Sequence, residues 1–550
     1  MSAHAYHVEE ARGDEVDRTI SATSDTTKAV GDISNEKKAG LKYSAGGIER
    51  VPQPSDDPRD PLNWPMPKKI AIFGIMCFGT FVGIASAVAN VLALPVQAQD
   101  FGITPEQASY SISAVLGGIV VGPVVLVAAV RVFGVMSCCF WSELAVVATS
   151  IWSSLSTGPG AFNSFAASRA IAGLFTGTVQ VFSAGVIAQI FFLHQRGRAF
   201  AIYSTIYMVS AVAGPTFSAF IVQYHPWPVC FWWTVAANGL SAVLFFFLGD
   251  ETGWDRVNNR PPSANRVPET WLKKRLVLFF PGTRVVAPGK MNHVKTSYSV
   301  LAKVAFSPIC ILAGIYSLIN YAWFIMAGVQ VPIILDSPPS EQGFGFTSQA
   351  TGYFYFSAWV GALIGVAYGI LINDRLPLWI KHRRHGLWHP EYRLHTAWFP
   401  GLVVEPIGVG LFGAAVYYHL HYMVLAVAEA MIVFGATACI SPAVNYVIEV
   451  FKSHPQEVGT ALNVYRIAFS VAIQFFYAPW TVRVGVNWAW GTAAFITIFS
   501  CVLIAVLFWK GRLLRKYSLL PDEAAEEEEL YQRSLKAAEV PATTSKHGSH

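Results

Sequence analysis

Long apolar runs alternate with short polar connections along most of this chain. A helix needs about 20 apolar residues to cross about 30 Å of hydrocarbon, and twelve runs reach that length. We predict spans over residues 70–96, 109–130, 136–155, 162–192, 199–222, 230–249, 306–335, 348–372, 396–418, 422–450, 458–482 and 486–510. A polar stretch, residues 250–303, separates the first six spans from the last six. The pattern predicts an all-α membrane protein with twelve transmembrane helices in two six-helix bundles.

Composition supports this class. The chain is 53% hydrophobic and 13% charged, whereas soluble domains carry about 25% charged residues. These values exclude an ordinary soluble enzyme. The seven cysteines lie in or beside apolar runs without CxxC spacing, so we expect no metal site and no disulfide framework. We predict these parts: a disordered cytoplasmic tail over 1–68, a first bundle over 69–249, a cytoplasmic central loop over 250–304, a second bundle over 305–510 and a cytoplasmic tail over 511–550.

The distribution of Lys and Arg predicts the orientation. With an even number of spans both termini lie on one side, and nearly all basic connections fall on that side too. The opposite side carries Arg483 together with acidic residues such as Asp100 and Asp336. Because basic loops stay in the cytoplasm, we expect both termini and the central loop to be cytoplasmic.

Two charged residues inside the spans are the first candidates for function. Arg169, Gly173, Gly177 and Gln180 share one face of the fourth span, and a charge in a span normally faces protein or a water-filled cavity. Arg169 is therefore a candidate for substrate or proton coupling; alternatively it bonds backbone carbonyls and fixes helix packing. Glu429 in the tenth span is a candidate proton or cation site, or a static partner of an arginine.

The two halves show weak internal similarity. Arg169 aligns with Glu429 at an offset of 260 residues. Gly214 and Pro215 align with Ala478 and Pro479 at an offset of 264. Such offsets favour a six-plus-six repeat and hence pseudo-symmetric bundles.

Several motifs carry a family resemblance. They are DPRDPLNWPMPKK (57–69), Arg169 with Gly173, Gly214-Pro215, HPEYRL (389–394), Asn463 to Arg466 and Pro479-Trp480. With these, residues 57–516 resemble the major facilitator superfamily. Within it, they resemble the fungal twelve-span drug:proton antiporter branch, including its histidinol- and polyamine-transporter-like relatives.

The resemblance implies gating elements, with departures. The loop after the second span keeps Arg131 and Gly134 but reads VRVFGVMS, without the acid and the basic pair of the superfamily motif. The matching loop of the second half keeps Asp374 and Arg375, so we expect the gate to depend on them. Gly214 and Pro215 are expected to allow close helix contact and a bend in the fifth span.

The resemblance also implies that spans 1 and 7 line a central cavity. The remaining candidates for substrate or proton coupling are Asn90, Gln180, Asn320, Tyr321, Gln330, Asn463 and Arg466. Contacts between helices are an equally common use of buried amides, and a structural ion pair is the alternative for Arg466. Glu143 and Glu405 lie in spans 3 and 9, where a supporting structural role is favoured.

The functional prediction is a proton-coupled transporter of the plasma membrane that works by alternating access. We expect it to export an amphipathic organic compound, as a monomer, with protons and the lipid bilayer as its other partners. We expect no cofactor and no nucleic acid, and the chain shows no nucleotide-binding, hydrolase or redox signature. Alternatives are uptake of a small cation such as a polyamine, and a transport-inactive nutrient sensor. A remote one is a membrane acyltransferase using His419 or His421.

Overall fold

The computed structural model describes residues 53–254, 270–280, 290–341, 343–373, 375–383, 389–451 and 453–520. Residues Asp56–Glu526 belong to one compact unit, and the description below concerns that unit. Residues 1–52 of the predicted tail over 1–68, residues 521–550 of the predicted tail over 511–550, and residues 255–269 and 281–289 of the predicted central loop lie outside the described residues. The predicted domain boundaries stay predictions.

Among the described residues, the first half consists of six long helices and one short helix, α4. They are α3 (Met66–Ala87), which continues through the 3-10 turn η2 (Val91–Ala93) into α4 (Leu94–Phe101), then α5 (Pro105–Phe133), α6 (Val135–Leu155), α7 (Phe162–Ile190), α8 (Leu193–Tyr224) and α9 (Val229–Leu248). A 3-10 turn, η1 (Pro61–Asn63), precedes α3. Two helices follow α9 before the second half begins, α10 (Trp271–Phe279) and α11 (Lys290–Ala305).

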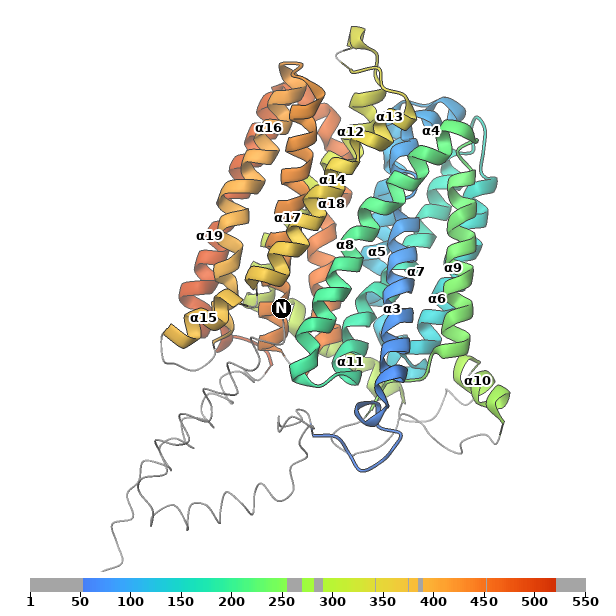
Figure 1. Cartoon of the computed structure of the whole chain (residues 1–550), viewed down its shortest axis with the longest axis vertical. Helices are drawn as coiled ribbons and strands as arrows, with labels where there is room; N and C mark the ends of the chain where they lie inside the picture. The colour runs from blue at the N-terminus through green and yellow to red at the C-terminus, as the bar shows by residue number, and fades with distance from the viewer. Residues whose placement is uncertain are drawn as a thin grey trace, which may run out of the picture. The chain divides into compact units, whose positions relative to one another are not determined.

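The second half repeats this plan. It consists of α12 (Pro308–Asp336), η4 (Pro339–Glu341), α13 (Ser348–Phe354), α14 (Phe356–Tyr368), a π-helical turn η5 (Gly369–Asn373), α15 (Arg375–Arg383), η6 (Pro390–Ala397), a second π-helical turn η7 (Pro400–Val404), α16 (Glu405–Tyr417), α17 (Tyr422–Val450), α18 (Pro455–Val484) and α19 (Val486–Arg515). Figure 1 shows the blue and green helices of the first half beside the yellow and red helices of the second.

The prediction of an all-α protein with twelve spans is confirmed. Among the described residues, 12 helices are long and apolar enough to cross a membrane. The tenth span, Tyr422–Val450, has the predicted bounds. The largest differences are at the first span, Met66–Phe101, and at the ends of the eighth and ninth, where polar residues near the ends of the spans are also helical.

Glycines set the closest helix contact in the first half, between α5 and α7. A Cβ atom at Gly118 would lie 2.2 Å from the carbonyl oxygen of Ala170, and one at Gly173 would lie 2.1 Å from that of Val115. Without side chains at these positions the two backbones approach closely, as small residues allow in membrane helices. The predicted glycine face of α7 therefore packs on α5.

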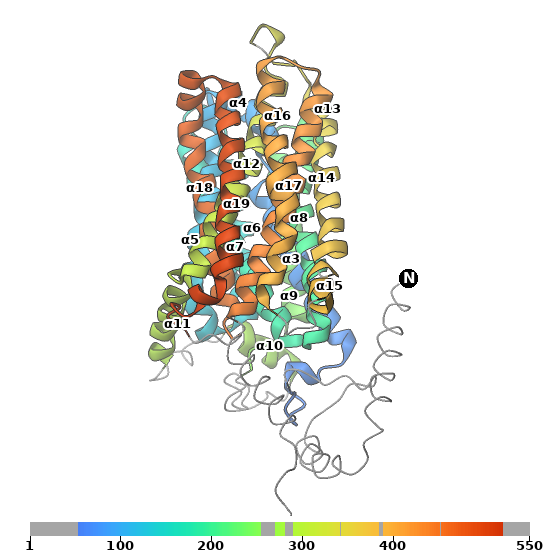
Figure 2. The ribbon, with the colours of Figure 1, turned by 90° about the vertical axis from the view of Figure 1, so that its left-hand side faces the viewer.

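Two seams join the halves. On one, α5 lies against α18 (Figure 2), and the Ser113 hydroxyl donates to the carbonyl of Val471 at 3.2 Å. On the other, α8 lies against α13 and α14, and the Trp359 indole donates to Thr216 Oγ1 at 2.9 Å. Helices from the two halves also meet at each end of the unit, α7 with α18 at one end and α12 with α4 at the other.

Charged residues cluster at one end of the unit, which we call the basic end and define by Lys68, Asp250, Lys274 and Arg275. Asp250 lies 2.6 Å from the Lys68 ammonium, 3.2 Å from that of Lys274 and 3.3 Å from the Arg275 guanidinium. Burial alone would raise the pKa of Asp250, but the hydrogen bond from Lys68 and the three positive charges outweigh burial and lower it. This cluster ties the start of α3 to α10.

The position of the Glu251 carboxylate leaves no room for a side chain at Gly134. The Glu251 carboxylate accepts hydrogen bonds from the backbone N–H groups of Val135 and Met136, at 3.1 and 3.2 Å, where α6 begins. Burial raises the pKa of Glu251, against the opposing effect of these hydrogen bonds. Gly134 has φ +95°, and a Cβ atom there would lie 2.3 Å from Glu251 Oε2. An acid from the end of the first half therefore caps the degenerate loop after span 2.

The PEYRL segment makes ion pairs at the same end of the second half. Arg393 lies 2.5 Å from Glu449 on α17, and Glu391 pairs with Arg515 on α19. These pairs hold η6 against two helices of its own half.

Candidate functional site

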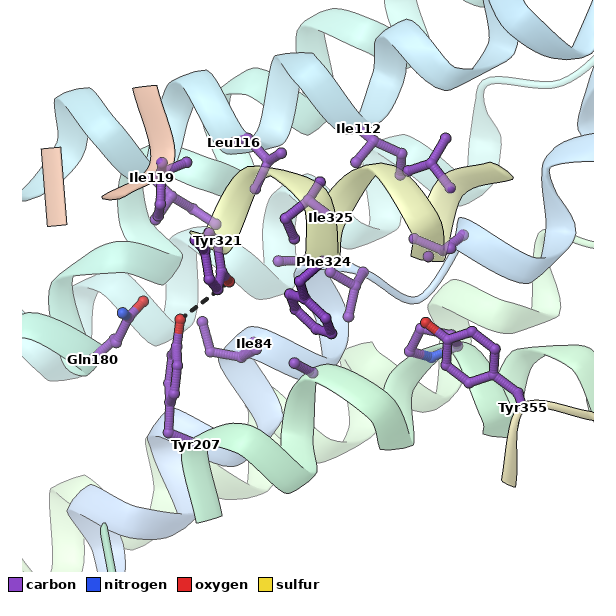
Figure 3. A pocket seen from close by; sticks show the side chains of 18 residues that line it. Ile84, Ile112, Leu116, Ile119, Gln180, Tyr207, Tyr321, Phe324, Ile325 and Tyr355 are labelled. Atoms are coloured by element: carbon purple, nitrogen blue, oxygen red, sulfur yellow. Dashed lines mark hydrogen bonds between the residues drawn. The ribbon is translucent and has the colours of Figure 1, made fainter. Parts of the chain in front are cut away.

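A pocket lies between the two halves (Figure 3). Its walls come from α3, α5, α7 and α8 of the first half and from α12, α18 and Tyr355 of the second. Most of the lining is aliphatic or aromatic, including Ile84, Leu116, Ile119, Phe324 and Ile325. The lining side chains with polar atoms are those of Gln180, Tyr207, Tyr321 and Tyr355.

The pocket is small in this conformation. Its volume is about 40 Å³, which holds only a few water molecules, whereas pockets for drug-sized ligands measure about 300–1,000 Å³. An organic ligand of that size therefore enters only after the helices around the pocket have moved apart.

Two tyrosines join the halves across the pocket. The hydroxyl of Tyr207 on α8 lies 3.3 Å from the hydroxyl of Tyr321 on α12 (Figure 3). Arg466 on α18 lies against both rings, with its Cζ atom 5.1 Å from the Tyr207 centroid and 4.9 Å from the Tyr321 centroid. This is the distance range of a cation–π interaction.

Asn463 connects Arg466 to the rest of the site. Its Oδ1 accepts from the Arg466 guanidinium at 3.0 Å and from the Gln180 amide at 3.3 Å. Its amide donates to the carbonyl of Ile119 at 3.0 Å. Arg466, Asn463, Gln180 and Tyr321, all predicted from the sequence as site residues, thus come together with Tyr207 at one end of the pocket.

Arg169 lies elsewhere. It is fully buried, its guanidinium donates to the carbonyls of Ser86 and Ala87, and its Cζ atom lies 5.1 Å from the Phe231 ring. Those carbonyls belong to the last turn of α3, where the regular helical bonds end; the Ser86 carbonyl also accepts from the Ala89 N–H at 3.4 Å. Because Ala87, Val88 and Val91 line the pocket, Arg169 stabilises the break in the first span that shapes one wall. This is the geometry of the alternative interpretation, in which Arg169 fixes packing.

Glu429 is fully buried in α17, and neither carboxylate oxygen has a hydrogen-bond partner among the described residues. It interacts electrostatically with Tyr355, which lines the pocket. Glu429 therefore lies outside the Arg466 cluster and is not among the residues that line the pocket; its link to the pocket is the electrostatic interaction with Tyr355.

Known proteins share this architecture and this sequence pattern. A family model for the Major Facilitator Superfamily matches residues 76–473. The chain belongs to the Major Facilitator Superfamily. It is therefore a membrane transporter, and the predicted resemblance is confirmed.

Its relatives in this superfamily include fungal transporters of similar length. The efflux pump radE of Floropilus chiversii is 24% identical over 465 residues, covering 84% of each protein. The MFS-type transporter penM of Penicillium rubens is 24% identical over 495 residues, covering 86% of this chain and 94% of penM. The MFS transporter cpaT of Aspergillus oryzae is 22% identical, covering 87% of this chain and 96% of cpaT.

The fold is also that of solved transporters. The peptide transporter POT in complex with sulfate is 16% identical, with a TM-score of 0.52, and the match covers 82% of this chain and 96% of that protein. At this identity the likeness concerns the fold alone.

Three amides predicted to contact substrate in this transporter belong neither to the pocket lining nor to the Arg466 cluster. Asn90 donates to Ser111 Oγ at 3.0 Å, within the first half. Asn320 donates to the carbonyl of Tyr316 at 2.7 Å and to Ser500 Oγ at 3.3 Å, within the second half. Gln330 is buried in α12 but is not among the residues that line the pocket.

The predicted gating residues are spread over the unit. Arg131 belongs to α5 and Arg375 is exposed at the start of α15, whereas Asp374 lies outside the described residues. Pro215 lines the pocket. Gly214 allows close approach of α8 to α3, since a Cβ atom there would lie 2.3 Å from the Ala85 carbonyl oxygen.

Tyr207 is a site residue that the sequence did not predict. Its span contains a second tyrosine, Tyr203, four residues earlier on the same helical face, and Tyr203 donates to the carbonyl of Gln180 within the first half. Nothing in the sequence separates the two roles. In the described part of the chain no three His, Cys, Asp or Glu side chains converge on a point that could hold a metal ion.

Proposed function

We propose that this transporter exports an amphipathic organic compound in exchange for protons, as a monomer in the plasma membrane. The observation that carries the proposal is the pocket itself, because both halves contribute to it and its lining is apolar and aromatic with a few polar groups. Such a lining suits an organic molecule more than an inorganic ion. The naming of radE as an efflux pump supports the direction.

The places where the halves touch support alternating access. At the basic end a Cβ atom at Gly185 on α7 would lie 2.3 Å from Gln456 Nε2 on α18, so the two helices are in close contact. At the other end α12 meets α4. We propose that rocking of the halves opens one contact at a time. The Tyr207–Tyr321 and Gln180–Asn463 bonds join the halves between the two ends, and a ligand would separate them.

Glu429 is our candidate for the proton site. A buried charge without a partner is costly, so a carboxyl at this position exchanges its proton most readily when the pocket opens to water. Its interaction with Tyr355 gives a route by which protonation affects the pocket wall. We propose that proton binding at Glu429 and substrate binding favour different orientations of the halves.

The basic end faces the cytoplasm in this proposal. The cluster of Lys68, Lys274 and Arg275 with Asp250 lies at that end, and basic connections are retained on the cytoplasmic side. A single cysteine introduced in place of Glu106, on the other side, tests this orientation. An impermeant thiol reagent should label it on intact cells. Labelling only after permeabilisation would contradict it.

The central experiment is flux of a fluorescent amphipathic compound in proteoliposomes, with and without an imposed pH gradient. We expect the gradient to accelerate flux in the wild type, and Glu429→Gln to transport at a rate independent of the gradient. Glu143→Gln is the matched control, since Glu143 is a buried carboxyl on α6 outside the pocket lining. Wild-type flux that ignores the gradient would remove the proton from the mechanism.

Uptake of an organic cation is the second candidate, and Glu429 near Tyr355 is the observation that favours it. Cellular accumulation separates the two functions. Deletion of the gene raises the cellular content of the compound if the protein exports it and lowers that content if the protein imports it.

A further inference from the structure

The charge around the pocket is one-sided. No aspartate or glutamate occurs among the residues that line it. Where Tyr207 and Tyr321 meet, the adjoining charged side chain is that of Arg466. An arginine keeps its positive charge at every physiological pH, so this end of the pocket is cationic.

Arg466 is not neutralised by the described residues. Its hydrogen bond goes to the uncharged Oδ1 of Asn463, its Nε has no hydrogen-bond partner among the described residues, and no described carboxylate forms an ion pair with it. Contact with the two tyrosine rings stabilises the cation without cancelling its charge. A lone charge in a membrane span is expensive and usually has a functional partner.

We propose that the exported compound carries an acidic group, a carboxylate or another anionic oxygen group, which pairs with Arg466 when the compound is bound. This inference rests on the proposed function and names its substrate class. A guanidinium presents its N–H groups as a planar fork that matches a carboxylate, and Asn463 orients that fork. The apolar body of the compound then lies along Ile84, Leu116 and Ile325, away from the charge.

The geometry also assigns a step to the tyrosines. Their hydroxyls contact each other at 3.3 Å, and Arg466 lies against both rings. An anionic group that reaches Arg466 passes between these rings, and both hydroxyls then donate to the anion, so that the bond between the two tyrosines is lost. Binding of the acid therefore breaks a contact between the halves.

The test measures binding to the purified full chain in lipid nanodiscs. The probes are matched pairs of an aromatic acid and its primary amide: 2-naphthoate with 2-naphthamide, and 9-anthracenecarboxylate with its carboxamide. We expect each acid to bind the wild type more tightly than its amide, on the order of tenfold, as a charge-assisted pair predicts. Arg466→Gln should reduce that ratio to about one, and Arg466→Lys, which keeps a point charge without the fork, should give an intermediate ratio.

Arg483→Gln is the matched control, because Arg483 lies exposed near the far end of the same helix, and it should leave the ratio unchanged. If Arg466→Gln does not fold, the ratio of acid to amide binding is measured for the wild type at high salt instead, and high salt should lower that ratio. Equal binding of acids and amides, an acid preference that survives Arg466→Gln, or binding of neither member of any pair would overturn the inference. In that case, proton-coupled flux of a neutral compound would still support the proposed function. Flux that does not depend on the pH gradient would overturn the proposed function, but not the inference about an acidic substrate.

Discussion

The hydroxyls of Tyr207 and Tyr321 lie 3.3 Å apart and join helix α8 of the first half to α12 of the second. Both residues are buried, so the contact forms away from bulk solvent. Together with the Gln180–Asn463 bond it joins the halves beside the pocket, in addition to the bonds along the two seams. A movement that opens the pocket has to break them.

The first prediction concerns this tyrosine pair. Tyr207→Phe and Tyr321→Phe each remove one hydroxyl and should each lower the free energy of unfolding by about 0.5–1.5 kcal/mol, the net value of one hydrogen bond. Because both variants break the same bond, the double variant should cost much less than the sum. Thermal unfolding in detergent measures this, with Tyr353→Phe, at an exposed position on α13, as the control. Additive effects would mean that the hydroxyls do not interact.

A second prediction separates two buried asparagines. Asn463→Ala removes the group that orients Arg466 and leaves the Gln180 amide and the Ile119 carbonyl without this partner. We expect substrate affinity to fall at least several-fold, together with a loss of about 1–3 kcal/mol in unfolding free energy. Asn320→Ala loses bonds to Tyr316 and Ser500 within the second half. It should cost similar stability while leaving the KM for transport unchanged; equal changes in KM would contradict the assignment.

The sequence predicted the twelve spans because apolar length alone determines them, and the bounds of α17 agree with the prediction. It predicted four members of the site, since polar residues inside apolar runs are rare enough to stand out. It could not predict which way they face. Arg169 bonds the carbonyls of Ser86 and Ala87 because the first span breaks there. Pro95 at the start of α4 is compatible with such a break, but nothing in the sequence links the break to Arg169.

Long-range contacts determine the other features that the sequence could not predict. Glu251 caps α6 beside Gly134, although 117 positions separate the acid from the glycine (251 − 134). The loop after span 2 reads as a degenerate motif when it is examined alone. Only the folded chain supplies the missing carboxylate, and it comes from the segment after span 6.

The third prediction uses two neighbouring glycines of α5. A Cβ atom at Gly118 would lie 2.2 Å from the Ala170 carbonyl oxygen, whereas one at Gly117 would meet nothing within 4 Å. Gly118→Ala should force α5 and α7 apart and lower the free energy of unfolding by about 1–3 kcal/mol. Gly117→Ala should be neutral or stabilise the helix by about 0.5–1 kcal/mol. Melting temperatures of the two variants give the comparison, and equal values would show that the close α5–α7 contact is not formed.

The fourth prediction concerns Arg169. Arg169→Leu removes the guanidinium that bonds the Ser86 and Ala87 carbonyls at the end of α3 and should destabilise the protein by about 1–3 kcal/mol. Arg169→Lys offers one ammonium group to these carbonyls and should lose less stability. Since Arg169 does not line the pocket, the dependence of flux on the pH gradient should persist in the fraction that folds. Folded Arg169→Lys protein with uncoupled flux would instead place Arg169 in the proton pathway.

The last prediction is a pH dependence at the basic end. The pKa of Asp250 in the folded protein lies below its usual value of 3.8, because its bond to Lys68 and the nearby Lys274 and Arg275 charges outweigh burial. A group whose pKa is lowered by folding stabilises the folded state fully above its unfolded pKa, and this contribution disappears as the pH falls through the folded pKa. At pH 7, Asp250→Asn should therefore be less stable than the wild type by about 1–3 kcal/mol. The difference should begin to shrink near pH 3.8 and vanish at lower pH.

Glu106→Gln, at an exposed position at the other end, is the control and should show a much smaller difference. An Asp250→Asn penalty that stays constant through this acid range would mean that the ion cluster does not hold α3 and α10 together.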